Sequence, residues 1–428
     1  MDQTISVDHD ASAVTKIASS QLLGTLLTFP PSVRHLVDVT MFWSAASGGV
    51  RRYLMRKRAA LRPLPGWVHT VVAPGALGPA LVDCGGVPLP FSGGYRLPLR
   101  RRYAAMLIAR QSPSLIEVAD PYRLAWAGLD AAQRLGVPAV AFCHSNLPAM
   151  AARLAGAEGV AARWARRAAE DYLRRVYARF DLVLAPSAAM ANELLRLGIE
   201  RVEHQALGVD SRIYHPSRRD PRKRELWRQT LALPADARLL LYAGRFAPEK
   251  NLPILVKAVE KLGAPYYLLV VGSGPRLPRG ERVRVLPYEA SEAELARIYA
   301  SADGFVHAGD QETFGLSALE AMASGIPLAV RAAAGLGELV GDGAGIAVDS
   351  AAADDWAEAI HGLFDEKHEA RIRTARLRAE ALDWRKVIPG LLRRYEALLA
   401  GVPTAEAARR RAFESGVQAT PATAPAAS

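Results

Sequence analysis

The strongest constraint on this chain is a repeated order of short apolar strand, glycine-containing turn and helix. The first unit has a β-branched and aromatic segment at 36–43, a turn at Ser47-Gly48-Gly49 and a helical segment at 50–61. Further strands are predicted at 68–72, 115–118, 139–142 and 182–185, with helices at 123–135 and 163–179. This alternation is typical of a doubly wound α/β domain, in which helices cover both faces of a largely parallel sheet.

The alternation starts again after a proline- and charge-rich segment, 211–234, which we interpret as the linker and the entry to a second domain. Strands are predicted there at 239–242, 267–271, 283–286, 304–307 and 327–330, and helices at 251–262, 292–301 and 315–323. We therefore expect two Rossmann-like domains, at 34–210 and 211–382, facing a central cleft. The remaining segments are an extension at 1–33, a helix at 383–400 that crosses back to the first domain, and a flexible tail at 401–428.

Charge and cysteine content limit the partners and the compartment. The 54 Lys and Arg exceed the 43 Asp and Glu, and the formal charge of +11 favours an anionic partner. No nucleic-acid partner is predicted, because no recognised module or aromatic-interleaved basic patch is present. Two cysteines, Cys84 and Cys143, are too few for a disulfide framework, and the chain lacks a secretory signal or a membrane-spanning run. We expect a cytoplasmic protein, whose short apolar stretch at 22–29 packs on the first domain or touches a membrane surface.

Two glycine-containing turns of the second domain follow strand ends, where ligands of open α/β sheets bind. Gly244 and Arg245 follow one strand, and Lys250 lies at the start of the next helix, so the two cations suit a phosphate group. A solvated loop with surface charges is the alternative. Gly272 and Gly274 would let a nucleotide lie against the backbone, although a plain Gly/Pro turn explains them as well.

Glu312 and Glu320 are separated by eight positions, with the first expected in a loop and the second in the second turn of a helix. Such carboxylates can accept hydrogen bonds from the hydroxyls of a sugar and a ribose. The alternative is an acid that complements a helix dipole, together with an unrelated surface glutamate.

The first domain offers the Gly48-Gly49 turn and His144, both directly after predicted strands. The turn lacks the GxGxxG pattern of dinucleotide sites and the lysine of ATP-hydrolysing loops. A lone histidine is more often structural than functional, and the position of His144 at a strand end favours a functional role only modestly.

Together these motifs resemble the family-4 retaining glycosyltransferases of GT-B fold, over about residues 34–400. The motifs that carry the resemblance are Ser47-Gly48-Gly49-Val50, His144, Leu207-Gly208-Val209-Asp210, Tyr214-His215-Pro216, the loop from Gly244 to Asn251, Gly272-Ser273-Gly274-Pro275, and the stretch from Glu312 to Pro327. The stretch 307–315 is most similar to bacterial mannosyl- and glucosyltransferases that act on lipid or glycan acceptors.

The resemblance implies a role for each matching side chain. Arg245 and Lys250 would neutralise the donor diphosphate as it departs. Glu312 would hold hydroxyls of the donor sugar, and Glu320 would hold the ribose hydroxyls. His144 would lie near the reacting sugar and hydrogen-bond it.

The remaining donor contacts implied by the resemblance come largely from the backbone. They are the turn at Gly48 and Gly49 over the phosphates, the amides of Phe314, Gly315 and Leu316, the glycines Gly244, Gly272 and Gly274, and the base contact near Tyr288. Many family members have a glycine at the end of the strand that meets the base, where this chain has Pro287-Tyr288-Glu289. This departure leaves open whether the donor is linked to GDP or UDP.

The reaction implied by the resemblance is transfer of a hexose, mannose or glucose, from a nucleotide sugar to a lipid-linked or glycan acceptor. Retention would follow from front-face attack without a protein nucleophile. No cofactor or metal is expected, because the sequence shows no cluster of metal ligands. The alternative functions are a sugar phosphorylase or a nucleotide-sugar epimerase of the same fold. A non-enzymatic lectin is disfavoured, because both cations and both glutamates are present.

Basic residues of the first domain are interleaved with apolar ones in three segments, at 51–62, 96–110 and 163–175. This pattern suits the headgroup region of an anionic membrane. We therefore predict peripheral docking on the inner face of the plasma membrane, with solvated helix faces as the alternative.

Overall fold

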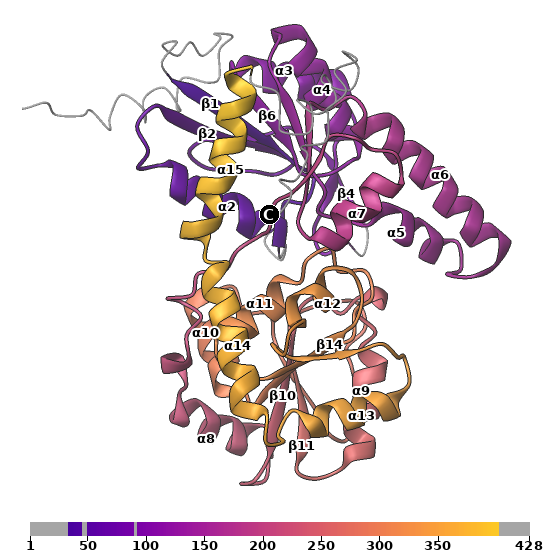
Figure 1. Cartoon of the computed structure of the whole chain (residues 1–428), viewed down its shortest axis with the longest axis vertical. Coiled ribbons are helices and arrows are strands. Elements are labelled where there is room, and N and C mark those ends of the chain that lie inside the picture. The colour runs from indigo at the N-terminus through magenta and orange to yellow at the C-terminus, as the bar shows by residue number, and fades with distance from the viewer. Residues whose placement is uncertain (1–32, 45–48, 90–91, 402–428) are drawn as a thin grey trace, which may run out of the picture.

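The computed structural model describes residues 33–44, 49–89 and 92–401. Its two parallel sheets, each flanked by helices, confirm the predicted α/β class and lie in separate halves of the molecule (Figure 1). Three predictions concern residues outside the described ranges: the extension over 1–32, the apolar stretch at 22–29 and the tail at 402–428.

The first sheet has seven parallel strands in the order β3-β2-β1-β6-β7-β8-β9. In chain order they are β1 (Arg34–Val39), β2 (Trp67–Ala73), β3 (Leu81–Asp83), β6 (Leu115–Val118), β7 (Ala139–Phe142), β8 (Leu182–Ala185) and β9 (Val202–His204). Val37 lies opposite Thr70 in β2 and opposite Ile116 in β6, so β1 is central. Because both faces are covered, every residue of β1 and β6 except Arg34 is buried.

The first strand is four residues shorter at its end than the predicted 36–43. The chain turns after Val39, because the Asp120 carboxylate accepts a hydrogen bond from the Met41 amide at 2.7 Å. The Thr40 hydroxyl accepts another from the Phe42 amide at 2.9 Å. Local side-chain acceptors of this kind compete with the sheet for backbone donors.

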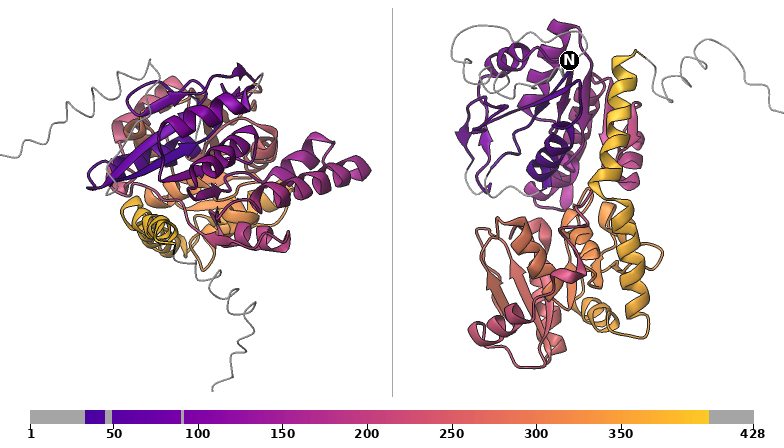
Figure 2. Two further views of the ribbon diagram at one scale, coloured as in Figure 1. Left: turned by 90° about the horizontal axis from the view of Figure 1, so that it is seen from above. Right: turned by 90° about the vertical axis from the view of Figure 1, so that its left-hand side faces the viewer.

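The helices of the first half are α2 (Gly49–Leu61), α3 (Arg101–Arg110), α4 (Arg123–Leu135), α5 (Leu147–Leu154), α6 (Gly159–Tyr177) and α7 (Ala188–Arg196), and a small hairpin joins β4 (Val87–Pro88) to β5 (Arg96–Leu97). The side chain of Asn146 caps α5 and that of Ser187 caps α7. Helix α6 starts four residues before the predicted 163. Helices α5 and α6 pair as an antiparallel hairpin that projects from the first half (Figures 1 and 2).

The second sheet has six parallel strands in the order β12-β11-β10-β13-β14-β15. They are β10 (Arg238–Ala243), β11 (Tyr266–Val271), β12 (Val283–Leu286), β13 (Gly304–His307), β14 (Leu328–Arg331) and β15 (Ile346–Val348). The accompanying helices are η2 (Pro248–Lys250), α9 (Leu252–Leu262), α10 (Glu292–Ser301), α11 (Leu316–Ala323), α12 (Ala334–Val340) and α13 (Ala353–Gly362).

The segment 211–234, interpreted as the linker and the entry to the second domain, contains two helices, η1 (Pro216–Arg218) and α8 (Pro221–Thr230). Asp220 caps α8 by accepting from the amides of Arg222 and Lys223, and Pro221 occupies the first turn. Trp227 is buried, and Lys223 pairs with Glu294 of α10. The charge run therefore belongs to an amphipathic helix packed on the second half.

The chain crosses between the halves a second time between α14 (His368–Ala381) and α15 (Trp384–Leu399). Helix α14 lies on the second half, and α15 runs along the first (Figures 1 and 2). Arg394 of α15 donates to Glu203 of β9 at 2.7 Å, and the Tyr395 hydroxyl donates to the buried Glu117 of β6. These contacts join the end of the described chain to the first sheet.

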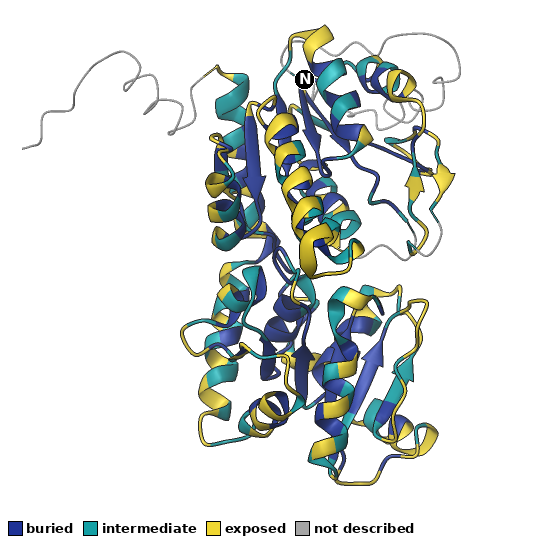
Figure 3. Ribbon diagram, turned by 90° about the vertical axis from the view of Figure 1, so that its right-hand side faces the viewer, coloured by how far each residue is buried: buried dark blue, intermediate teal, exposed yellow. Residues whose placement is uncertain are grey.

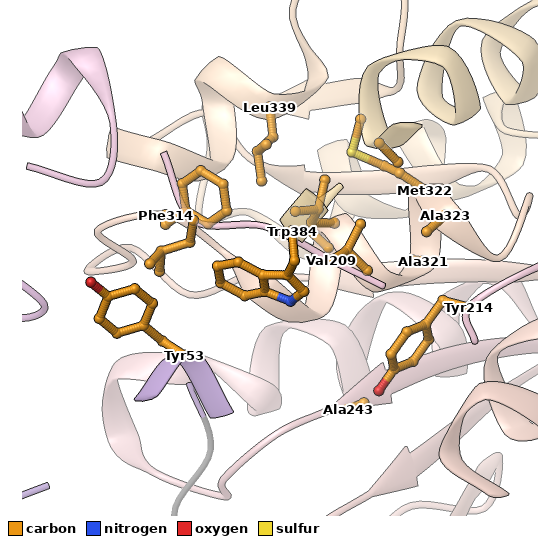
Figure 4. Close-up of a cluster of buried hydrophobic side chains, with 14 of the residues drawn as sticks. Tyr53, Val209, Tyr214, Ala243, Phe314, Ala321, Met322, Ala323, Leu339 and Trp384 are labelled. Atoms are coloured by element: carbon orange, nitrogen blue, oxygen red, sulfur yellow. The ribbon is translucent and has the colours of Figure 1, made fainter. Parts of the chain in front are cut away.

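One apolar cluster extends through both halves, and buried residues fill the centre of each (Figure 3). Where the halves meet, Tyr53 of α2, Phe314 and Trp384 lie close together (Figure 4). Burial of apolar surface from both halves holds the two sheets in a fixed relation and sets the shape of the space between them.

Candidate active site

A cavity of about 280 Å³ lies between the two halves, where both sheets present the carboxyl ends of their strands. The predicted site residues that line it are Gly49, His144, Gly244, Arg245, Lys250, Gly272, Tyr288, Glu312, Phe314, Gly315, Leu316 and Glu320. Gly48 lies outside the described residues, and Gly274 does not line the cavity. The tertiary structure therefore brings together residues that are up to 271 positions apart, from Gly49 to Glu320.

The loop after β10 supplies the two cations. Arg245 is 42 % exposed and pairs with Glu249 at 2.9 Å, while its carbonyl oxygen accepts from the Tyr242 hydroxyl at 2.8 Å. Lys250 ends the short helix η2, is 16 % exposed and forms an ion pair with Glu312. Both positive charges thus face a shared space in which an anion would gain from them.

Glu312 lies in the loop between β13 and α11, as the sequence predicted. Besides Lys250, its carboxylate meets the His307 Nε2 atom at 3.4 Å. Burial opposes ionisation, but the Lys250 charge and the His307 contact hold the pKa of Glu312 well below its usual range. Glu312 is therefore an anion at neutral pH and can only accept hydrogen bonds.

Helix α11 starts at Leu316, one residue later than predicted, because Gly315 adopts a φ of +102°. A Cβ at Gly315 would approach the Leu336 side chain to 2.5 Å, so the position requires glycine. Glu320 is in the second turn of α11 with its side chain only 4 % exposed, and it pairs with Arg52 of α2.

The glycine turns after β10 and β11 pack directly on each other. A Cβ at Gly272 would lie 1.9 Å from the Gly244 carbonyl oxygen. Gly274 is packed under Phe246, whose carbonyl oxygen would be 2.4 Å from an added Cβ. Gly274 therefore permits close packing of the two loops. It does not line the cavity, although the sequence had predicted a contact with the nucleotide-sugar donor there.

His144 follows β7, which brings it to the cavity from the first half. Its ring stacks on Phe142 at 4.3 Å between centroids, and its carbonyl oxygen accepts from the Thr313 hydroxyl at 3.2 Å. Burial, and next the charge of Lys57, lower the pKa of His144 to about 3, so the ring is neutral at neutral pH. Within the described part of the chain its Nε2 atom is buried without a hydrogen-bond partner.

The lining residues that were not predicted for the site include Arg52, Tyr95 and Thr313. Arg52 had been assigned to a basic surface, although it lies only three residues after Gly49 and in the first turn of the same helix. Its position close to the glycine turn was the sequence signal that could have identified Arg52 as a site residue. Tyr95 carries no comparable signal, because a loop of the first half delivers it to the cavity.

The described ranges lack two features, a metal-ligand cluster and a membrane-spanning helix. They contain no group of three or more His, Cys, Asp or Glu side chains placed to hold a metal ion. No helix in them has both the length and the apolar character needed to cross a bilayer.

Comparison with known proteins agrees with this geometry. Residues 47–213 match the model of Glycosyltransferase Family 4, and residues 223–379 match that of Glycosyl transferases group 1. A GDP-mannose-dependent alpha-mannosyltransferase of Mycolicibacterium smegmatis is 35 % identical over 67 % of this chain and 74 % of its own length. The chain therefore belongs to the family-4 glycosyltransferases and is a glycosyltransferase.

Other relatives and a solved structure extend the comparison. A GDP-mannose-dependent alpha-(1-6)-phosphatidylinositol dimannoside mannosyltransferase of Mycobacterium tuberculosis is 29 % identical over 84 % of this chain and 95 % of its own length. A second mannosyltransferase of that organism is 35 % identical over 53 % of this chain, which spans 58 % of that relative. The sucrose-phosphate synthase of Thermosynechococcus elongatus, 21 % identical, matches with a TM-score of 0.70 over 86 % of this chain and all of its own. The predicted GT-B fold is confirmed.

Proposed function

We propose that this glycosyltransferase transfers mannose from GDP-mannose to a lipid-linked or glycan acceptor with retention of the anomeric configuration. The observation that carries the proposal is the joint placement of Arg245, Lys250, Glu312 and Glu320 around one interdomain cavity. The choice of mannose is supported by relatives that are GDP-mannose-dependent mannosyltransferases.

Different side chains bind the different parts of the nucleotide-sugar donor. Arg245 and Lys250 bind the diphosphate, where negative charge grows as the bond to the sugar breaks. Glu320 accepts from the ribose hydroxyls, and Glu312 accepts from hydroxyls of the sugar. Donor binding then replaces the ion pair between Lys250 and Glu312 by contacts of each side chain with the ligand.

The acceptor hydroxyl oxygen forms a bond to the anomeric carbon on the face from which the diphosphate leaves. The bond between that carbon and the phosphate oxygen breaks, and the hydroxyl proton passes to the departing phosphate. His144, being neutral, orients the sugar by a hydrogen bond without adding a positive charge beside the developing oxocarbenium carbon. No protein nucleophile takes part.

The test is a donor screen with purified protein. GDP-mannose, UDP-glucose, UDP-galactose and UDP-N-acetylglucosamine are compared for binding and for slow hydrolysis. We expect GDP-mannose to bind most tightly and to be turned over faster when a lipid or glycan acceptor is added. Phosphorolysis of a glycan, or epimerisation of the donor without an acceptor, would instead support the alternative functions.

We also propose that the first half docks on an anionic membrane surface, through the predicted segment 163–175 on α6 and not through α2. Lys57 of α2 is fully buried and pairs with Asp38 and Glu117, each at 2.7 Å. Arg52 and Arg56 of the same helix pair with acids of the second half. Arg52, Arg56 and Lys57 are therefore part of the interior and of the domain contact, and they are not available to lipid.

The projecting hairpin of α5 and α6 fits the membrane proposal better. At its tip Leu154 is 83 % exposed and Trp164 is 68 % exposed, and Val160 lies one helical turn before Trp164. Arg163, Arg166 and Arg167 are exposed beside them and form no ion pair with the described residues. Apolar and aromatic side chains bordered by free cations suit the headgroup layer of an acidic leaflet, as on the inner face of the plasma membrane.

A further inference from the structure

Arg52 connects the two halves at the carboxylate that the proposed function assigns to the ribose. It lies in the first turn of α2 and forms an ion pair with Glu320, and it lines the cavity that also holds Arg245 and Lys250. Its side chain is 28 % exposed against 4 % for Glu320. The carboxylate is thus held inside the protein, while the guanidinium stays at the edge of the cavity.

We infer that Arg52 is a donor-binding residue with two partners in turn. In the empty enzyme it neutralises Glu320, and in the donor complex it moves to the diphosphate as a third cation, supplied by the first half. The inference rests on the proposed function, because it requires a nucleotide whose ribose takes Glu320.

The chemistry of Glu320 explains why the pair must open. A buried carboxylate without a compensating charge is costly, and Arg52 is its ion-pair partner within the described ranges. A vicinal diol, however, offers two donors that suit the two oxygens of one carboxylate. When the ribose hydroxyls replace the guanidinium, Arg52 loses its partner next to a ligand with two phosphate groups.

The position of Arg52 on its helix favours the same exchange. The first turn of α2 contains no acidic residue, and it places Arg51 and Arg52 at the positive end of the helix dipole. An anion at this end is favourable and a lone cation is not. Close approach is already established there, because a Cβ at Gly49 would lie 3.0 Å from the side chain of Leu316 in the second half.

The helix itself need not move for the exchange to occur. Arg56, one turn after Arg52, pairs with Asp210 at 3.1 Å and with Glu292 of α10. Lys57 fixes the opposite face of α2 in the first half through Asp38 and Glu117. With α2 anchored at these two residues, rotation of the Arg52 side chain is sufficient to carry its charge from Glu320 toward the phosphates.

The test compares ligands that differ in the diphosphate alone. Dissociation constants of guanosine and GDP are measured for the wild type, for Arg52→Gln, for Arg52→Lys and for the control Arg62→Gln, a solvent-exposed cation just after α2. Thermal unfolding verifies that each variant is folded. Steady-state kinetics with GDP-mannose give kcat and KM for the same proteins.

For Arg52→Gln we expect guanosine to bind as tightly as to the wild type or up to severalfold more tightly, because Glu320 has no competing partner. GDP should bind about tenfold more weakly, and kcat should fall by at least the same factor. Arg52→Lys should restore part of the GDP affinity, and Arg62→Gln should change neither ligand.

Three results overturn the inference. If guanosine and GDP weaken by one common factor, Arg52 has a merely structural role. If both ligands bind more tightly, Arg52 neutralises Glu320 in the empty enzyme but does not contact the diphosphate. Failure of the wild type to bind GDP is distinct from both, since it removes the proposed GDP donor itself and the inference with it.

Discussion

Arg245 and Lys250 are held differently in the empty site, although they lie in one loop. Among the described residues Arg245 is paired only with its neighbour Glu249 and is 42 % exposed, whereas Lys250 is enclosed and paired with Glu312. An exposed cation is free to follow the leaving phosphate, while an enclosed one is already in place. Both should act mainly on the transition state, in which the charge on the diphosphate is greatest.

We therefore expect Arg245→Ala and Lys250→Ala each to lower kcat by about 100-fold or more, with little change in the thermal unfolding midpoint. The control is Lys261→Ala, which removes an exposed cation on α9 that is paired at the surface with Asp354. Transfer rates measured with GDP-mannose decide the question. Near-normal turnover in both site variants would contradict the assignment of the phosphate loop.

The two glutamates should separate nucleotide binding from sugar transfer. Glu320→Ala should weaken GDP binding by about tenfold, equivalent to about 1.4 kcal/mol, because the ribose loses its acceptor. Glu312→Ala should leave the GDP dissociation constant within about twofold and lower kcat by about 100-fold. Calorimetry with GDP and transfer assays give the two quantities.

The design needs two controls. Since Glu320→Ala also frees Arg52, the double variant R52Q/E320A isolates the share of the glutamate itself. Glu366→Ala, an exposed acid, should be neutral in both measurements. Equal loss of GDP affinity in the two single variants would refute the division of roles.

Two buried histidines predict how stability depends on pH. Burial lowers the pKa of His144 to about 3 and that of His35 to about 4, from an ordinary value of 6.5. Below pH 6.5 both histidines therefore bind protons in the unfolded chain while they stay neutral in the folded chain. The contribution of the two neutral rings to the free energy of unfolding is complete above pH 6.5 and is lost as the pH falls toward 3 to 4.

We expect the thermal unfolding midpoint to fall between pH 7 and pH 5, with about 2 kcal/mol of stability lost per histidine between pH 6.5 and pH 5. His144→Gln should make this dependence shallower, whereas His204→Gln, at an exposed position, should not. Differential scanning calorimetry across this range makes the comparison. A pH profile that His144→Gln leaves unaltered would contradict the burial of a neutral ring.

At the level of elements, the helices show why a charge pattern by itself misleads. The cations of α2 were predicted to face a membrane, yet Lys57 has no exposed surface and compensates two buried carboxylates. The charge run at 218–224 was interpreted as part of the linker and the entry to the second domain, and it contains the Asp220 cap and the first turn of helix α8. Apart from Asp38 in the preceding strand, the acidic partners come from elements far away in sequence, so local patterns could not pair them with these cations.

The α5–α6 hairpin carries the prediction for membrane docking. The protein should co-sediment with phosphatidylglycerol vesicles and not with neutral phosphatidylcholine vesicles, and binding should fall as salt rises. Trp164→Ser combined with Arg163→Ser and Arg167→Ser should weaken this binding at least tenfold. The matched control is Arg218→Ser combined with Arg222→Ser, which removes two exposed cations of η1 and α8 on the second half. No binding to anionic vesicles at low salt would leave the hairpin without this role.

At the level of the whole molecule, the cleft between two sheets needs cations and helix ends from both sides to balance a diphosphate. The side chains at the cavity supply positive charge from Arg245, Lys250 and, in our inference, Arg52. We therefore expect transfer activity to survive EDTA and to change less than about twofold when Mg²⁺ or Mn²⁺ is added. Loss of activity with EDTA that Mn²⁺ restores would show that a metal shares this task.

Much of the architecture could be read from the sequence. Buried parallel strands are nearly continuous apolar runs, so β6, β7, β8 and β13 fall at the predicted positions. Short or edge strands such as β3, β9 and β15 were missed, because three-residue segments carry too little pattern. The loops that follow the strands of a parallel sheet share one edge, which is why twelve of the predicted site residues line one cavity.

The sequence by itself determined the α/β class, the two repeats of strand and helix, and the loops that carry chemistry, because each depends on local patterns of apolar, glycine and charged residues. Only the tertiary structure decided which charges meet: Arg52 with Glu320, Lys250 with Glu312, and Lys57 with Asp38 and Glu117. The physical reason is that an ion pair depends on distance and burial, and residues as far apart as Arg52 and Glu320 acquire both only when the two halves close on one another.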